Sequence, residues 1–306
     1  MKTTGIKIIL VYAMLCFIWG STWLAIRFGL ESLTPIFSAG LRFSLASIFI
    51  LILMRIKGIT LQLDKIAVRL YLLMGFMSFV IPFGLVYWAE QFVPSGMASV
   101  LFGVFPFFVA IFSYLFIPSE KINSFMITGM IIGFGGIVVI FSNSFTGNIT
   151  SYLLGMIAIV FSAIIQASIA VTIKKFGKHL NSLSMNFIPM LIAGVSMLVI
   201  SLFTENVSTN RFETNAILSI IYLAFFGSVL TFTSYYWLLK KINIVILSLI
   251  AFITPIVALI LGYIVYNEEL STHHFIGSAM VLLGILAANL KNLFNLKKTT
   301  IFKVKG

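Results

Sequence analysis

Ten stretches of mostly apolar residues, each about twenty residues long, follow one another along this chain and constrain its fold more than any other feature. A helix rises about 1.5 Å per residue, so each stretch is long enough to cross the hydrocarbon core of a bilayer once. The first to tenth predicted spans cover residues 6–28, 34–54, 69–89, 95–117, 122–141, 151–173, 183–203, 215–238, 242–266 and 272–292. The connections are short, so function must lie within the helices or at their ends.

The composition excludes several classes of protein. A mean hydropathy of +1.13 and 9% charged residues do not fit a soluble domain. Cys16 is the only cysteine, and the three histidines fall in or beside short connecting segments, so we expect no disulfide, metal or other cofactor. The spans hold no nucleophile paired with a base, so an enzyme is not expected. No cleavage signal follows the first stretch, which we expect to be retained as a helix.

The net charge of +12 is explained by membrane topology rather than by nucleic-acid binding. With the N-terminus inside, 17 of the 20 basic residues fall in cytoplasmic segments, Arg27 and Arg211 fall outside, and Arg42 lies within a span. We therefore expect both termini in the cytoplasm and the chain in a bacterial cytoplasmic membrane. The basic tail, residues 293–306, is interpreted as a topology determinant, with a lipid or partner patch as the alternative.

The two halves of the chain match when the sequence is shifted by 149 residues. Tryptophan and proline are rare here, so their coincidence indicates structural repeats more strongly than a match of Ile with Leu. The matching pairs are Tyr87-Trp88 with Tyr236-Trp237, Pro106 with Pro255, Tyr114 with Tyr263, Glu120 with Glu269, and Gly135 with Gly284.

Five spans fall in each predicted repeat, residues 6–144 and 150–292. An odd number of spans makes the second repeat enter the membrane upside down relative to the first, so the fold is predicted as two inverted five-helix repeats. Inverted repeats are typical of secondary transporters, in which two halves rock about a site at the bilayer midplane. The alternative is a repeat that only builds a stable scaffold or a channel-like bundle.

Several motifs together resemble the EamA-type members of the drug/metabolite transporter superfamily, over nearly the whole chain. They are WGSTW from Trp19 to Trp23, the Arg42-Phe43 pair, YWAEQFVPSGMASVLFGVFPFFVAIF from Tyr87 to Phe112, and the terminal Glu120 and Glu269. The resemblance implies a ten-helix exporter-like fold with a central cavity lined mainly by spans 1, 3, 4, 6, 8 and 9. It also implies substrates such as amino acids, their derivatives and other small metabolites. Ala167 stands opposite Trp19 and Met190 opposite Arg42, so the cavity chemistry is expected to be asymmetric.

Two prolines mark the region where we expect the binding site. Pro106 and Pro255 fall at matching positions within spans, where each removes a backbone donor and frees a carbonyl group. Small residues at helical spacing accompany them, among them Ser99 in the fourth span. Such stripes permit close helix packing as well as contact with a ligand.

The first span presents an aromatic face. Tyr12, Cys16, Trp19 and Trp23 follow one another at steps of three and four residues, and Ser21 lies in the small, hydroxyl-rich segment between the tryptophans. This face could stack against a substrate. Trp23 also fits an aromatic belt at the outer interface, whereas Trp19 lies deeper and is the better binding candidate.

Arg42 is the one fully charged side chain well inside a predicted span. It is expected to find a partner such as Glu31, Glu90 or free carbonyl groups, because an unpaired charge at that depth is costly. It is interpreted either as a counter-ion for a substrate carboxylate or as a hydrogen-bonded brace. Glu90, at the end of the third span, is our candidate for a gate or a proton carrier if transport is proton-coupled; passive or exchange transport is the alternative.

Further candidates for the cavity are polar or aromatic residues in the spans that the resemblance places at the centre. Hydrogen bonding between helices explains them as readily as substrate binding does. They are Tyr87, Trp88, Ser162, Gln166, Ser228, Thr231 and Tyr235. The glycines at 129, 133 and 136 indicate helix packing instead, either within the chain or in a homodimer.

The sequence thus predicts a secondary transporter that exports small metabolites, such as amino acids or their derivatives, by alternating access at a midplane cavity. Its expected partners are a small-molecule substrate and the lipid bilayer, with no nucleic acid. The alternative is a membrane scaffold or channel-like bundle that does not transport in this way.

Overall fold

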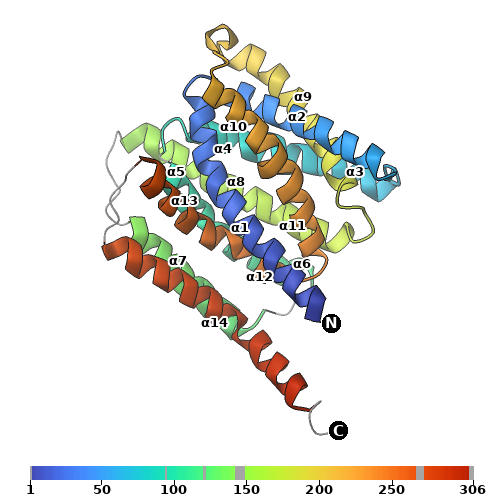
Figure 1. The fold of residues 1–306 in the computed structure, drawn as a ribbon, viewed down its shortest axis with the longest axis vertical. Coiled ribbons are helices and arrows are strands. Elements are labelled where there is room, and N and C mark those ends of the chain that lie inside the picture. The colour runs from blue at the N-terminus through green and yellow to red at the C-terminus, as the bar shows by residue number, and fades with distance from the viewer. Residues whose placement is uncertain (1, 94, 120–121, 142–148, 267–271, 303–306) are drawn as a thin grey trace.

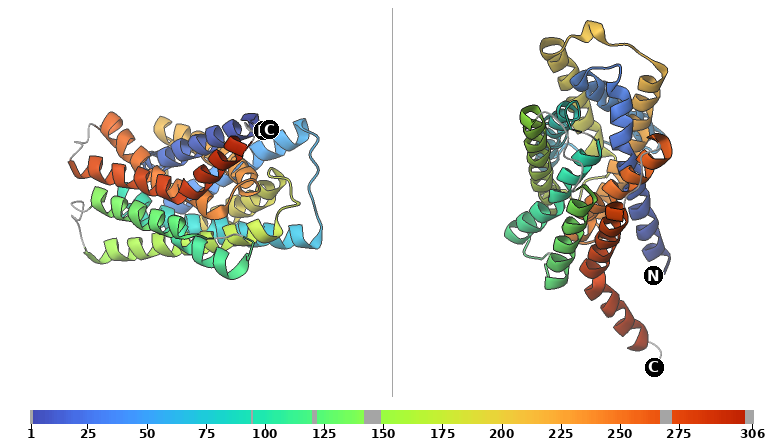
Figure 2. Two further views of the ribbon diagram at one scale, coloured as in Figure 1. Left: turned by 90° about the horizontal axis from the view of Figure 1, so that it is seen from below. Right: turned by 90° about the vertical axis from the view of Figure 1, so that its left-hand side faces the viewer.

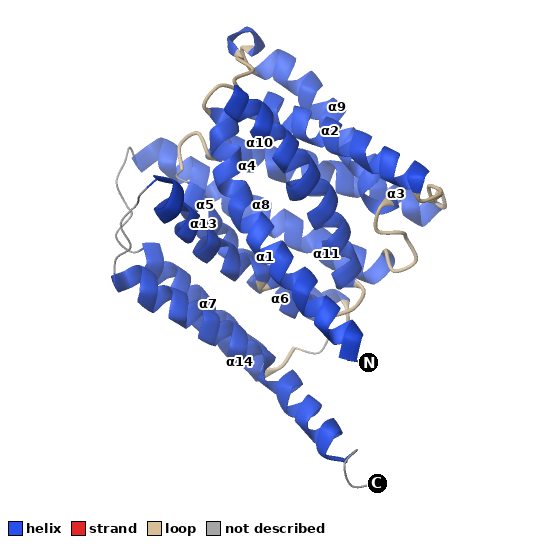
Figure 3. Ribbon diagram, viewed as in Figure 1, coloured by secondary structure: helices blue, strands red, loops and turns tan. Residues whose placement is uncertain are grey.

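The computed structural model describes residues 2–302, except 94, 120–121, 142–148 and 267–271. These residues form helices and connections, without any strand in the described part (Figure 3). The α-helices are α1 (Lys2–Leu30), α2 (Pro35–Ile56), α3 (Lys65–Met74), α4 (Ile81–Ala89), α5 (Ser95–Leu101), α6 (Phe105–Phe116), α7 (Ser124–Phe141), α8 (Ile149–Phe176), α9 (Ser184–Thr204), α10 (Thr214–Ala224), α11 (Thr231–Leu239), α12 (Ile244–Ser248), α13 (Ile250–Tyr266) and α14 (Thr272–Phe302). Short π-helical turns, Gly75–Val80 and Phe225–Leu230, and 3-10 turns, Phe102–Val104 and Val207–Thr209, join some of them.

The predicted membrane fold is confirmed. Eight helical segments are long and apolar enough to cross a membrane: Gly5–Leu30, Pro35–Ile56, Lys65–Ala89, Met97–Phe116, Leu153–Phe176, Ser184–Thr204, Thr214–Leu239 and Ile244–Val265. Two shorter apolar helices, Ser124–Val139 and Thr272–Ala288, fall at the fifth and tenth predicted spans. Large apolar side chains face outward along the bundle, with Phe203 85% exposed, as a lipid-facing surface requires.

Local sequence signals explain where several helices begin and end. Pro35 lies in the first turn of α2, where a missing N–H carries no penalty, and Gly58 follows α2 at φ +60°. Asp64 caps α3 by accepting hydrogen bonds from Ile66 N and Ala67 N. Asn243 caps α12 in the same way, through Val245 N and Ile246 N.

Four spans are interrupted, and the third and eighth are interrupted in the same way. The third and eighth spans each contain a π-helical turn, and in the third span Pro82 follows that turn and lacks a backbone donor. In the fourth span the 3-10 turn Phe102–Val104 directly precedes Pro106. The ninth span instead breaks between α12 and α13, and Pro255 lies inside α13. The expected break at Pro255 therefore occurs more than one turn earlier.

Helices of one half pack on helices of the other (Figure 1). The most extensive contacts join α7 to α14 and α2 to α9. Helix α1 packs on α13 and on α10 and α11, and α8 packs correspondingly on α4 and α6. These main contacts of the first span thus have counterparts made by the sixth span, which is the pattern that two symmetry-related repeats produce.

Glycines bring the fifth and tenth spans into backbone contact. A Cβ at Gly129 would collide with the Gly284 carbonyl oxygen, and a Cβ at Gly284 would lie 2.5 Å from that of Gly129. A Cβ at Gly133 would lie 2.7 Å from the Phe252 ring, and one at Gly136 would lie 2.5 Å from the Gly277 carbonyl oxygen. From the sequence, these glycines could pack either within the chain or in a homodimer. In the structure they pack within the chain, against α14 and α13.

Hydrogen bonds join α2 and α9 at both ends of the pair. At one end the Glu205 carboxylate accepts bonds from Ile36 N at 2.7 Å and Phe37 N at 3.0 Å, at the N-terminus of α2. At the other end the connection after α2 is bonded to the connection before α9: Gln62 Nε2 donates to the His179 carbonyl group, and Gln62 Oε1 accepts from Asn181 N. This pair of helices is therefore held as one unit across the bundle.

The two described ends of the chain emerge from the same end of the bundle (Figure 2, right). Helix α14 continues well beyond its apolar part, Thr272–Ala288, to Phe302. A chain that crosses a membrane an even number of times begins and ends on the same side.

Candidate substrate cavity

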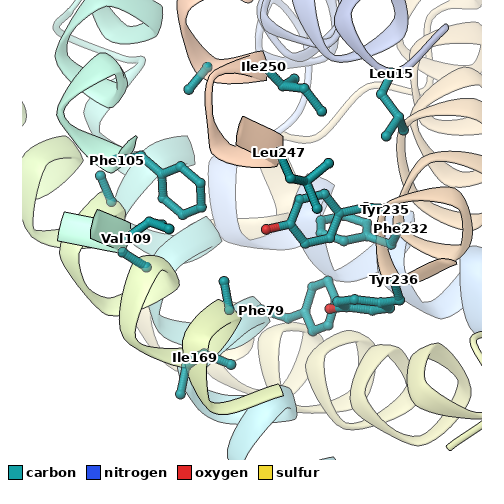
Figure 4. Close-up of a cluster of buried hydrophobic side chains, with 14 of the residues drawn as sticks. Leu15, Phe79, Phe105, Val109, Ile169, Phe232, Tyr235, Tyr236, Leu247 and Ile250 are labelled. Atoms are coloured by element: carbon teal, nitrogen blue, oxygen red, sulfur yellow. The ribbon is translucent and has the colours of Figure 1, made fainter. Parts of the chain in front are cut away.

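A cavity of about 120 Å³ lies between helices of both halves. Its walls come from α1, α2, α4, α6, α8, α11, α12 and α13, from the π-helical turn Gly75–Val80 and from the 3-10 turn Phe102–Val104. Figure 4 shows Phe105, Leu247, Tyr235 and Tyr236 directed toward a common space. The lining residues are Trp19, Thr22, Trp23, Ile26, Arg42, Ser78, Phe83, Val86, Phe102, Phe105, Gln166, Ala170, Ile173, Phe232, Tyr235, Tyr236, Leu247, Ser248, Ile250, Ala251 and Thr254.

One wall of the cavity is aromatic. The Trp19 ring lies 5.4 Å from Phe232 and 5.3 Å from Tyr235, between ring centroids. Phe83 lies 6.1 Å from Phe232 and continues the wall toward α4. Tilted and edge-to-face contacts of this kind are favourable for aromatic pairs, so the rings form one connected surface.

Arg42 reaches this wall from α2 and is 1% exposed. Its Nε donates to Ser228 Oγ at 2.9 Å, Nη2 to the Gly227 carbonyl group at 3.0 Å, and Nη1 to Tyr87 Oη at 3.2 Å. The guanidinium carbon also lies 5.0 Å from the centroid of the Phe83 ring. Every one of these partners is uncharged, so the positive charge is solvated by dipoles and a ring.

The π-helical turn Phe225–Leu230 explains how this arrangement arises. A π-helical turn displaces the backbone hydrogen-bonding pattern of a helix and exposes carbonyl groups to other donors. Here the turn supplies both the Gly227 carbonyl group and the Ser228 hydroxyl to Arg42. Glycine at 227 allows the close approach of α1 and Arg42, because a Cβ there would lie 2.9 Å from Thr22 Cγ2 and 3.4 Å from Arg42 Nη2.

Gln166 is the polar group on the opposite side, from α8. Its Nε2 donates weakly to Ser162 Oγ at 3.4 Å, and Ser162 Oγ donates to the Pro82 carbonyl group at 3.1 Å. Ser162 is fully buried and does not line the cavity. It positions Gln166 and joins α8 to the start of α4.

Four of the predicted site residues therefore line the cavity, namely Trp19, Arg42, Gln166 and Tyr235, and Trp23 of the same aromatic face of α1 lines it too. Tyr87, Ser162 and Ser228 lie behind the wall and bond to lining residues or to the helix beside them. The structure brings these seven predicted site residues together.

The other predicted residues lie elsewhere. Ser21 accepts from the Tyr222 hydroxyl group at 2.6 Å, because its own proton goes to the Ile18 carbonyl group. Trp88 is 37% exposed and packs on Phe92. Ser99, Pro106, Thr231 and Pro255 are buried outside the wall.

Glu90 follows α4 and does not line the cavity. Both of its carboxylate oxygens are buried and have no hydrogen-bond partner. The carboxyl group lies within electrostatic range of Arg42 and Arg27. It does not bond to Arg42 directly, contrary to one partner that the sequence suggests. Glu120 and Glu269, the terminal motif residues, lie outside the described residues.

Sequence reasoning missed much of the wall. Phe83, Phe102, Phe105 and Phe232 line it, and nothing distinguishes them from other apolar residues in their spans. Ser248 and Ala251, which belong to the small-residue stripe of the ninth span, line it too, and Tyr236 could have been found because it matches Tyr87 in the repeat alignment. Within the described residues no group of three His, Cys, Asp or Glu side chains has the spacing of a metal site.

A family model described as "EamA-like transporter family" matches residues 6–142 and 153–290. Among curated proteins, the chain is 30% identical over 286 residues to "Uncharacterized inner membrane transporter YedA" of Escherichia coli, covering 92% of this chain and 90% of that one. It is 29% identical over 280 residues to "Protein PagO" of Salmonella typhimurium, covering 92% of each chain, and 26% identical over 280 residues to "Uncharacterized transporter YoaV" of Bacillus subtilis, covering 92% of this chain and 96% of that one. A protein crystal structure superposes with a TM-score of 0.79 at 16% identity, covering 93% of this chain and 96% of that one, and shows the same fold.

Proposed function

Because the chain belongs to the EamA-like transporter family, and is thus a membrane transporter, we propose that it moves a small organic metabolite by alternating access around the cavity described above. The observation that supports this most is the position of the cavity. It lies where broken helices of both halves meet, with a buried arginine in an aromatic wall. Irregular backbone at membrane depth is tolerated where it lines a cavity, and transporters place their sites there.

In this proposal the moving parts are the helices that surround the cavity. The pairs α2–α9 and α7–α14 are held by hydrogen bonds or by backbone contact, and they form the supporting units. The first, eighth and ninth spans then move against the third, fourth and sixth. The chain is divided into the repeats 6–144 and 150–292, followed by the cytoplasmic tail 293–306, and each moving group takes spans from both repeats.

We assign substrate contact to Trp19, Arg42, Gln166 and Tyr235, which line the cavity. Tyr87, Ser162 and Ser228 position them, and Glu90 acts at the mouth. The remaining predicted residues, Ser21, Trp88, Ser99, Pro106, Thr231 and Pro255, act through helix packing. We propose amino acids or their derivatives as substrates, with export as the direction.

The membrane is proposed to be a bacterial cytoplasmic membrane with both termini inside. The distribution of basic residues and the inner-membrane name of the YedA relative support this. A homodimer is a further proposal, and it would use surfaces other than the glycines that α14 covers.

Purified protein in liposomes tests the proposal. We expect saturable, protein-dependent movement of at least one compound from a panel of amino acids, carboxylates and amines, measured with and without a pH gradient. Single cysteines at positions 166 and 248, in a Cys16→Ser background, should react from either side but not from both at once, and should be protected by the transported compound. Position 47, buried outside the cavity, is the control. A scaffold would show no transport, and a channel would open both positions to both sides together.

A further inference from the structure

The charge of the cavity wall restricts what the cavity can bind. Arg42 is the one charged side chain among the lining residues that the structure describes, and the other polar groups there are hydroxyl groups and the Gln166 amide. Arginine is the residue type that proteins use most for planar, two-point binding of carboxylates. The wall therefore carries one fixed positive charge and, within the described residues, no negative one.

Arg42 has donors left over. A guanidinium group has five N–H groups, and three of them bond to Ser228, Gly227 and Tyr87. One N–H on each terminal nitrogen remains. Two such N–H groups on one planar guanidinium fit the two oxygens of a carboxylate, and the three existing bonds fix the plane in advance.

A carboxyl group of the chain itself, that of Glu90, lies within electrostatic range of Arg42. Its carboxylate oxygens make no hydrogen bond to Arg42, and the residue is not part of the wall. Glu90 can adjust the field at Arg42, but it does not occupy the remaining N–H groups.

The rest of the cavity determines the size and the apolar character of the part of the ligand that lies beyond its charged group. Trp19, Phe83, Phe232 and Tyr235 provide flat apolar surfaces. The volume of about 120 Å³ is close to that of an engineered apolar cavity of about 150 Å³ that binds benzene. The body is thus about the size of one ring.

We infer that the substrate is a small monocarboxylate with an apolar body of about one ring, bound through the carboxylate at Arg42, and that amines are rejected. This inference rests on the proposed function. It narrows the class to acids, including amino-acid derivatives whose amino group is absent or blocked. A free ammonium group would face Arg42 without any carboxylate on the described wall to receive it.

Three probes share a phenyl ring and differ in charge: 3-phenylpropionate carries a carboxylate, phenylalanine a carboxylate and an ammonium group, and phenethylamine an ammonium group. Binding to the purified full-length protein is measured by titration calorimetry, which avoids their passive leakage across liposomes. We expect 3-phenylpropionate to bind on the order of tenfold or more tightly than phenylalanine, and phenethylamine not to bind, because a charged hydrogen-bonded pair is gained in one case and a repulsion in the other.

Two variants test the role of Arg42. Arg42→Lys keeps the charge and loses the planar pair of donors, so 3-phenylpropionate should bind on the order of tenfold more weakly. Glu90→Gln is the control, because it removes a carboxyl group within electrostatic range of Arg42 and leaves the guanidinium group in place. In this variant the three probes should keep the same order of binding affinity. Melting temperatures verify that both variants fold; should Arg42→Lys not fold, the wild-type order of the probes decides alone.

Binding of phenethylamine or phenylalanine as tight as that of 3-phenylpropionate would overturn the inference. So would unchanged binding in folded Arg42→Lys, or a reversed order in Glu90→Gln. The proposed function fails separately, if liposomes containing the protein move no compound of the wider panel.

Discussion

At the scale of single residues, Arg42 shows how the two halves depend on each other. It belongs to the first half, and two of its three hydrogen-bond partners, Gly227 and Ser228, belong to the second. A guanidinium group buried in a bundle is tolerated because these dipoles replace water. The same bonds that stabilise the charge therefore also fix the register between α2 and the eighth span.

Replacing Ser228 by Ala should leave Arg42 Nε without an acceptor. We expect a loss of about 1–3 kcal/mol in the free energy of unfolding, the cost of an unsatisfied buried donor, together with slower transport. The measurement is thermal unfolding in detergent alongside liposome transport. Ser47→Ala is the matched control, because Ser47 is equally buried and bonds only within its own helix, to Ser44. Equal effects of the two changes would contradict the assigned role.

Trp19 should matter for transport more than for folding. Trp19→Ala removes ring contacts with Phe232 and Tyr235 at the cavity wall, and aromatic contacts of this kind contribute about 0.5–1.5 kcal/mol each. We expect transport to fall on the order of tenfold and the apparent affinity to weaken, while Trp19→Phe keeps most of both. A parallel loss of protein level and transport in Trp19→Ala would instead make it a packing residue.

Sequence reasoning found the residues of the site that are rare or costly in a membrane. Arg42 is conspicuous because charge is expensive in lipid, and Trp19 because tryptophan is scarce in this chain. Phe83 and Phe232 could not be found in this way, because the chain has 31 phenylalanines and only the three-dimensional arrangement distinguishes them.

At the scale of the helices, glycine determines how closely two spans can approach. Replacing Gly129 by Ala should push α7 away from α14, because the new Cβ would collide with the Gly284 carbonyl oxygen and lie 2.6 Å from Ala288 N. We expect a loss of about 1–3 kcal/mol, as for other overpacked sites, measured as a lower melting temperature.

Gly135→Ala provides the control on the same helix. There the nearest atom to a new Cβ is the end of the flexible Met280 side chain, at 3.6 Å. Stability should be unchanged or slightly higher, because alanine favours helix. A larger loss at 135 than at 129 would mean that the α7–α14 contact is not as described.

The start of α3 should respond to acid. Asp64 accepts from Ala67 N and Ile66 N and lies 3.4 Å from His179 Nε2, and the Ala67 bond contributes most to lowering the pKa of the Asp64 carboxyl group below its usual 3.8. A lowered pKa means that the stabilisation is present above the usual pKa and is lost as the pH falls through the lowered one.

Asp64→Asn keeps an oxygen that can cap the helix but has no charge to lose. We therefore expect the wild type to exceed the variant in melting temperature at pH 7, and this difference to shrink as the pH falls below about 4. Thermal unfolding at several pH values measures it. A difference that grows on acidification would contradict the sign.

The positions of the spans were predictable from hydropathy, because twenty apolar residues in a row have few alternatives to crossing the membrane. The interruptions were predictable only in part. Proline announced the break before Pro106, but nothing in the sequence announced the π-helical turn Phe225–Leu230 or the break at Leu249. Such turns arise from packing across the bundle rather than from a local signal.

At the scale of the whole molecule, topology follows from the number of crossings and the charge of the connections. Both described ends leave the bundle on one side, and the basic residues place that side in the cytoplasm in our proposal (Figure 2). The repeat predicted that the two halves would make corresponding helix contacts. It did not predict which helices pack together, because many pairings of helices satisfy the same hydropathy.

Labelling of single cysteines in intact cells tests this orientation, in the Cys16→Ser background. A membrane-impermeant maleimide should label position 209, in the exposed connection before α10, without further treatment. Positions 5 and 299 should be labelled only after the membrane is permeabilised. Gly5 tolerates the change, because nothing lies within 4 Å of a Cβ there. The reverse pattern would invert the proposed topology.

The two π-helical turns, Gly75–Val80 and Phe225–Leu230, lie in corresponding spans of the two halves. In the second half the turn gives its Gly227 carbonyl group to Arg42. In the first half the turn contributes Ser78 to the cavity wall instead. One kind of backbone irregularity therefore anchors a charge in one repeat and forms part of the binding surface in the other.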